Sequence, residues 1–264
     1  MENVLAVCLI LILAPVIKSE ECGVKRLKSE EGVERPWLGS IVQYGSGKDP
    51  EFLCMGTLIS NQHILTAAHC FDGKPLSPRR YSVQLETESS DSGAEYNIHF
   101  ITRHPSYIRG QTYNDLAILT LRTEVPDDTV PVCLPDPADS LDNMRAYVGE
   151  WLPKTPGGKD PYALNSQLAL ISTNEECNKY YSEVQLSELS RGLQDSQVCT
   201  DNRRGHGDCN RLTASPLMVT DRKQRWHVVA VATYRYNCEV DDTHPGVYTR
   251  VGDHLSWIQD VMRS

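Results

Sequence analysis

The sequence lacks several features that would define other classes of protein. Its 264 residues contain no internal repeat, no low-complexity segment and no basic run longer than a few residues. With a formal net charge of -9, the chain has no broad cationic field for gripping phosphate backbones, so nucleic acid is not an expected partner. No CxxC pair or histidine-rich spacing suggests zinc. We therefore expect no metal site and no cofactor.

One long apolar run lies at the N-terminus, from Val4 to Ile17, and Pro15 is its one interruption. The run is too short to cross a bilayer comfortably, so residues 1–19 are predicted to be a secretory signal cleaved near Ser19. Glu2, where a basic residue is usual, argues against this, and a buried N-terminal strand is the alternative. The prediction is a secreted, extracellular protein that does not bind a membrane.

The cysteines indicate disulfide bonds rather than a metal site. Cys8 leaves with the predicted signal, and an even number remains in an exported chain, which favours disulfides. Spacing alone does not choose among the possible pairings. The remaining cysteines are Cys22, Cys54, Cys70, Cys133, Cys177, Cys199, Cys209 and Cys238.

Short segments rich in β-branched and aromatic residues follow one another from Trp37 onward, separated by Gly, Pro, Asp, Asn and Ser clusters. They predict an all-β sandwich or barrels. The expected strands lie within 37–44, 52–60, 81–85, 96–101, 116–121, 146–151, 167–172, 226–234 and 246–251. Two helices are expected, a brief one over Asn174–Tyr181 and a terminal one that Asp253 can cap, with Leu255, Ile258 and Val261 on one face.

Two motifs carry candidate chemistry. His69 lies in the segment LTAAHC, directly before Cys70. Asp115 lies in the segment YNDLAILTL, just before an apolar strand. A lone histidine would be read as a core residue, and a lone aspartate as a solvated turn residue. Together they form a candidate general base and the carboxylate that orients it.

These motifs, in this order, make the chain resemble the trypsin-like (chymotrypsin-fold) serine protease family from Trp37 to Met262. The resemblance also rests on Pro36–Trp37, GTLIS at 56–60, PVCLP at 131–135, PGVYTRV at 245–251 and Trp257–Ile258. It implies two six-stranded antiparallel β-barrels packed face to face, a C-terminal helix and a site in the cleft between the barrels. Residues 37–264 would form the peptidase domain, and 20–36 a short segment tethered by Cys22.

The resemblance also implies a set of disulfide pairs. These are Cys22 with Cys133, Cys54 with Cys70, Cys177 with Cys199, and Cys209 with Cys238.

The loop after Cys209 departs from the family pattern, which has glycine, aspartate, serine and two glycines before proline and leucine. Pro216 and Leu217 keep the frame, and the position of the nucleophile holds Thr213. Its branched Cβ makes χ1 stiff, so presenting the hydroxyl to both an imidazole and a carbonyl carbon is harder. Threonine nucleophiles typically use their own terminal amine as base.

Two further substitutions fall in the same loop. Arg211 replaces the glycine that helps to bind the oxyanion, and losing one such donor costs on the order of 10² to 10³ in turnover. Leu212 replaces the aspartate that pairs with a freshly cut N-terminal ammonium. In the family this ammonium belongs to a new terminus of the Ile-Val-Gly-Gly type, and no such sequence occurs before Trp37. Cleavage after Arg26 would expose Leu27 instead. Because the aspartate and the ammonium are both absent, neither charge is left buried without its partner.

The resemblance places five residues at the specificity pocket: Gly207, Asp208, Thr233, Tyr234 and Arg235. Gly207 stands at the base, where trypsin itself has an aspartate. Arg235 replaces a glycine at the entrance, and we expect its side chain to obstruct it.

The combined losses predict a secreted, non-catalytic serine protease homologue that binds extracellular proteins, including proteases or their zymogens. It would act as a regulator, cofactor or decoy in an extracellular proteolytic cascade of the immune or melanization type. The alternative is a weak endopeptidase that uses Thr213 with His69 and Asp115. A carbohydrate or small-ligand binder is a third reading, and no aromatic cluster or glycosylation sequon helps to decide it.

Overall fold

The computed structural model describes residues 22–24, 35–45, 50–89, 92–136, 140–153, 162–184, 186–201, 214–235 and 245–264. Within these residues, short 3-10 turns follow β3 and β12, among other places, and there are two α-helices, α1 (Asn174–Val184) and α2 (Leu255–Arg263). The strands are β1 (Leu38–Gln43), β2 (Glu51–Ser60), β3 (His63–Thr66), β4 (Tyr81–Ser89), β5 (Ser92–Arg103), β6 (Ala117–Leu121), β7 (Arg145–Pro153), β8 (Tyr162–Ser172), β9 (Gln197–Asp201), β10 (Pro216–Thr220), β11 (Trp226–Arg235) and β12 (Gly246–Arg250).

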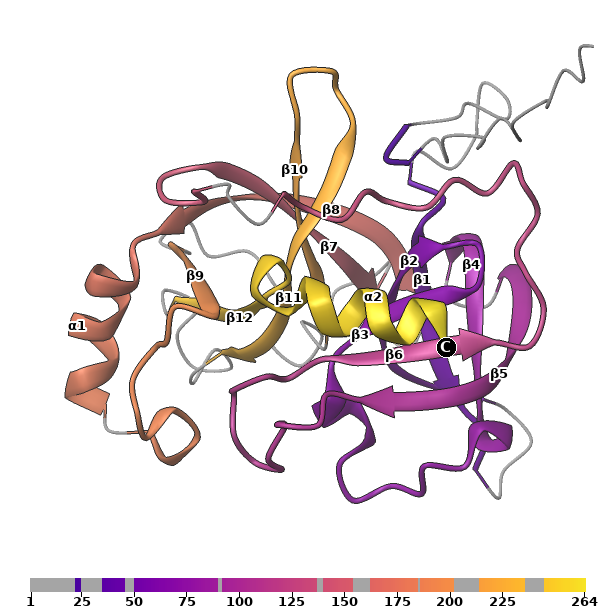
Figure 1. The fold of residues 1–264 in the computed structure, drawn as a ribbon, viewed down its shortest axis with the longest axis horizontal. Helices are drawn as coiled ribbons and strands as arrows, with labels where there is room; N and C mark the ends of the chain where they lie inside the picture. Colours follow the sequence, from indigo (N-terminus) through magenta and orange to yellow (C-terminus); the bar gives the residue numbers. More distant parts are fainter. Residues whose placement is uncertain are drawn as a thin grey trace, which may run out of the picture.

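The strands close into two antiparallel barrels. The first has the order β1-β2-β3-β6-β5-β4 and closes where β1 pairs with β4, and the second has the order β8-β7-β10-β11-β12-β9 and closes where β8 pairs with β9. One pairing, Ser89 with Ala163, joins them at an edge. Figure 1 shows the first barrel in indigo to magenta and the second in rose, orange and yellow, with α2 lying across the first. The predicted all-β fold with a C-terminal helix is confirmed.

A single apolar cluster crosses the boundary between the barrels. Trp37 precedes β1 and is fully buried, and its indole Nε1 donates a hydrogen bond to the sulfur of Met218 in β10 at 3.3 Å. Val231 of β11 and Ile258 of α2 belong to the same cluster as the core of the first barrel. The barrels are therefore held in register by shared buried surface as well as by the chain that links them.

Three strands and two helix boundaries differ from the sequence prediction. β3, β9 and β10 lie outside the nine expected segments, because each is short and almost wholly buried and so shows no polar alternation. The prediction that α1 ends at Tyr181 was wrong by three residues, since the helix continues to Val184.

The prediction that Asp253 caps the terminal helix was also wrong. α2 begins at Leu255 after a 3-10 turn, and its N-cap residue is His254. The carboxylate of Asp253 instead lies 3.4 Å from Nε of Arg250. Ile258 is fully buried, and Leu255 and Val261 pack against the same core, as the spacing predicted.

Replacing Trp37 with alanine is predicted to lower the free energy of unfolding by about 3–5 kcal/mol, because a large side chain is removed from the junction of the barrels. Urea denaturation followed by circular dichroism measures this change. The matched control is Phe100→Ala, because the side chain of Phe100 in β5 is 56% exposed; there we expect a change within about 0.5 kcal/mol. Equal losses in the two variants would contradict the role given to Trp37.

Candidate active site

The first barrel positions His69 through a short turn after β3. The 3-10 turn Ala68–Phe71 carries the histidine, and the disulfide between Cys54 of β2 and Cys70 ties this turn to the barrel wall. The hydroxyl of Thr66 donates to the carbonyl of Met55 at 2.8 Å and holds the end of β3 in place. The backbone under His69 is thus fixed from two sides.

Asp115 is fully buried at the end of the loop that leads into β6. The backbone N–H of His69 donates to its Oδ1 at 2.8 Å, and Nδ1 of the imidazole donates to its Oδ2 at 2.6 Å. The hydroxyl of Thr233, from β11 of the second barrel, also donates to Oδ2. A buried carboxylate is tolerated only when it is hydrogen-bonded in this way. In the neutral ring, Nε2 of His69 then carries the lone pair of a general base.

The environment of His69 favours its protonated form. Burial lowers the pKa of the imidazole, but the charge of Asp115 and its hydrogen bond to the ring raise the pKa by more, and the charge of Asp72 adds to them. The result is a pKa above the ordinary value. The side chain is 27% exposed, so protons can reach it from solvent.

Replacing Asp115 with asparagine is predicted to lower the pKa of His69 below its ordinary value, because burial is then opposed by less negative charge. A titration of the imidazole proton signals by NMR measures this. Since the wild-type pKa is raised, the extra stability of the wild type is fully present below about pH 6.5 and is lost as the pH rises through that raised pKa. Thr233→Val keeps the carboxylate and is the control, in which His69 should keep a raised pKa. An unchanged pKa in Asp115→Asn would contradict this account.

The residue before Asp115 shapes the loop. Asn114 has a φ of 53°, in the left-handed region that asparagine tolerates better than most residues. Its side-chain Oδ1 lies 3.1 Å from Nε2 of the buried His254, and its Nδ2 donates to the carbonyl of Ser106 at 3.4 Å. The turn before α2 therefore supports the loop that carries Asp115, a contact between residues 140 positions apart.

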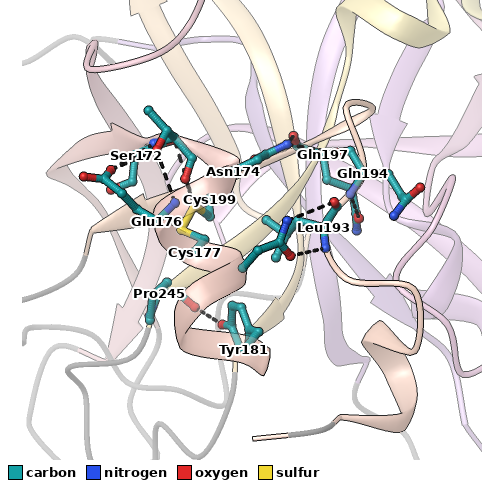
Figure 2. The surroundings of a disulfide bond; sticks show 12 residues. Ser172, Asn174, Glu176, Cys177, Tyr181, Leu193, Gln194, Gln197, Cys199 and Pro245 are labelled. Atoms are coloured by element: carbon teal, nitrogen blue, oxygen red, sulfur yellow. Dashed lines mark hydrogen bonds between the residues drawn. A yellow bond between two sulfur atoms is a disulfide. The ribbon is translucent and has the colours of Figure 1, made fainter. Parts of the chain in front are cut away.

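α1 is fastened to the strands of the second barrel. The disulfide between Cys177 and Cys199 joins α1 to β9, and the hydroxyl of Tyr181 donates to the carbonyl of Pro245 just before β12 (Figure 2). Tyr234 of β11 packs against this apolar cluster. β11, which carries three of the residues that the resemblance places at the specificity pocket, is therefore supported by a helix and a disulfide.

Most of the expected nucleophile loop lies outside the described residues. This holds for Gly207, Asp208, Arg211, Leu212 and Thr213, for the expected pair Cys209 and Cys238, and for the side chain of Arg235. Their roles stay predictions.

Ala214 and Ser215 directly follow that loop and belong to the described residues. Ser215 is fully buried, and its hydroxyl donates to the sulfur of Met55 at 3.8 Å. Ala214 is buried and has a φ of 60°, a conformation that costs an L-residue other than glycine about 1–2 kcal/mol. In the family pattern this position holds a glycine.

Replacing Ala214 with glycine is predicted to raise the free energy of unfolding by about 0.5–1 kcal/mol, because relief of the left-handed strain exceeds the added chain entropy of glycine. Thermal or urea denaturation measures the change. Ala146→Gly is the matched control: Ala146 lies buried in β7, whose pairing with β8 has an unbroken register, and glycine there is expected to destabilise the fold. Destabilisation of similar size in both variants would contradict the assignment of strain to Ala214.

Three disulfides join the described cysteines in the pairs that the resemblance implied: Cys22–Cys133, Cys54–Cys70 and Cys177–Cys199. Cys54, His69 and Cys70 bring potential metal-ligand atoms within 4.8 Å of one another. Both sulfurs belong to the disulfide, however, and a metal site needs thiolates. This group therefore does not fit a metal ion.

Two closed six-stranded barrels with a histidine–carboxylate pair between them are the arrangement of the trypsin fold. The family model described as Trypsin matches residues 26–258, so the chain belongs to the trypsin family of serine proteases. Within the described residues, no helix has the length and apolar character needed to cross a membrane.

Curated relatives include proteins of arthropod origin. The chain is 28% identical over 236 residues to the clotting factor G beta subunit of Tachypleus tridentatus, covering 86% of this chain and 75% of that protein. It is 32% identical over 237 residues to the venom serine protease Bi-VSP of Bombus ignitus, covering 83% and 63%. It is 26% identical over 282 residues to phenoloxidase-activating factor 1 of Holotrichia diomphalia, covering 94% and 74%. The chain thus spans about two thirds to three quarters of the length of these relatives.

Proposed function

We propose that this trypsin family member is a secreted, non-catalytic regulator in an extracellular proteolytic cascade. It would bind proteases or their zymogens through the surface of the protease fold and would not cleave them. The names of two relatives, a clotting factor subunit and a phenoloxidase-activating factor, associate this kind of chain with such cascades. The apolar N-terminal run supports secretion, with residues 1–19 as the signal.

The observation that carries the proposal is the residue at the nucleophile position, Thr213, in a frame set by Cys209 and by Pro216. Replacing the nucleophile of such a triad typically lowers turnover by about 10⁶. Arg211 and Leu212 replace the residues that would have formed and ordered the oxyanion hole. These losses affect one chemical step, the attack on the carbonyl carbon. In the proposed function, His69 and Asp115 therefore have no suitable nucleophile to activate.

The buried Ser215 does not offer a substitute nucleophile. Its hydroxyl is directed to Met55 within the core, and it is followed directly by Pro216 of β10. Reaching His69 would require exposing this side chain and breaking into the strand. A weak endopeptidase built on Thr213 itself remains the competing function.

The purified full chain is predicted not to react with a fluorophosphonate probe, because an activated hydroxyl is required for that reaction. In-gel fluorescence measures labelling, with an active trypsin as positive control and heat-denatured chain as negative control. Thr213→Ser is expected to remain unlabelled as well, because Arg211 and Leu212 still disrupt the oxyanion site.

Heat-sensitive labelling of the wild-type chain that is lost in Thr213→Ala would contradict the non-catalytic assignment and favour the endopeptidase. Labelling confined to Thr213→Ser would show that the nucleophile is the one decisive loss and that Arg211 and Leu212 matter little. A peptide ester hydrolysis assay on the same samples distinguishes turnover from a single covalent event.

A further inference from the structure

The tip of the hairpin between β10 and β11 is positively charged, although the chain as a whole is acidic. Its tip, residues 221–225, reads Asp-Arg-Lys-Gln-Arg and so places three cations within five positions, in a protein with a net charge of -9. Figure 1 shows this hairpin standing out from the second barrel, beyond the strands that cross its base. A large partner can therefore approach the tip from several sides.

The tip has a fixed shape because Asp221 organises it. Oδ1 of Asp221 accepts hydrogen bonds from the backbone N–H groups of Lys223 at 2.8 Å and Arg225 at 2.9 Å. Its Oδ2 accepts from the guanidinium of Arg225 through Nε and Nη2, both at 2.9 Å, and lies 3.4 Å from Nε2 of His227. The backbone N–H of Arg225, its side chain, His227 and Lys223 together hold the pKa of the Asp221 carboxyl well below its usual range.

This arrangement leaves two cations directed to the outside. Arg225 is paired with Asp221, whereas Arg222 and Lys223 are exposed and have no ion-pair partner in the part of the chain that the structure describes. At the base of the hairpin, the guanidinium of Arg35 lies 4.9 Å above the ring of Trp226. Because Arg225 neutralises Asp221, the tip presents the positive charges of Arg222 and Lys223 to solvent. Because the loop is already ordered, binding a partner does not carry the entropic cost of ordering it.

We propose that the β10–β11 tip is a docking element for an extended acidic segment of a partner protein. A flexible peptide can wrap a narrow convex tip and bring carboxylates to Arg222 and Lys223 together, with charge-assisted hydrogen bonds to the guanidinium. A stiff sulfated polysaccharide would contact such a tip along one line and would need a longer track of cations. The inference rests on the proposed function, since it names the chemistry of a protein partner for the regulator.

The probe is a fluorescent peptide of ten glutamates, titrated with the full chain in fluorescence anisotropy at low ionic strength, about 50 mM salt, where surface charges are weakly screened. The test variant is Arg222→Glu/Lys223→Glu, which leaves Asp221 and Arg225 intact. The matched control is Arg79→Glu/Arg80→Glu, which reverses two adjacent exposed cations of the first barrel and changes the net charge equally. Thermal melts check that both variants fold like the wild type.

We expect the wild type to bind the peptide, the tip variant to bind at least about tenfold more weakly, and the control to lose less than about threefold, because only the tip carries the contact. Equal losses in both variants would show a general effect of net charge and overturn the proposal. No binding by the wild type, or tighter tip-dependent binding of a heparin octasaccharide than of the peptide, would also overturn it. None of these outcomes depends on fluorophosphonate labelling, so the two proposals fail separately.

Discussion

The buried carboxylate of Asp115 is the constraint on which the rest of the site depends. An ionised group without solvent must be hydrogen-bonded from the protein, and its donors come from two different barrels. His69 supplies a backbone and a ring N–H from the first barrel, and Thr233 supplies a hydroxyl from β11 of the second. Satisfying one carboxylate therefore fixes how the barrels face each other and where the imidazole stands.

Under the proposed non-catalytic function, this constraint gives a physical reason for the chain to have a histidine and an aspartate of the protease type. Removing either partner alone would leave a buried charge or an unpaired donor at a cost of several kcal/mol. The hydroxyl of the nucleophile carries no such buried charge, so its loss is tolerated more easily by the fold. In the proposed function, His69 and Asp115 thus persist as part of the packing between the barrels, whereas Thr213 and its neighbours were free to change.

Rigid attachments hold the elements around the His69–Asp115 pair. Disulfides tie the turn under His69 to β2 and tie α1 to β9, and Tyr181 joins α1 to the start of β12. The β10–β11 hairpin projects from the same frame with its tip ordered by Asp221. A scaffold of this kind suits binding, because interaction surfaces held in one conformation cost little entropy when a partner docks.

By itself, the sequence determined the all-β class, nine of the strand segments, the candidate base with its carboxylate, and, through the family resemblance, the two-barrel fold and the pairing of the described cysteines. Local pattern is enough for the all-β class and the strand segments, because alternating apolar residues report which face of a strand is buried. The nine segments left out β3, β9 and β10, whose burial on both faces removes the alternation, and the helix cap was placed on Asp253.

Only the tertiary structure decided which distant atoms meet. The hydroxyl of Thr233 reaches Asp115 across 118 positions, and Asn114 reaches His254 across 140. The left-handed backbone of Ala214 likewise became visible only in the folded chain. Periodicity describes one segment and its exposed face, whereas a hydrogen bond between two barrels is set by their packing, which no single segment encodes.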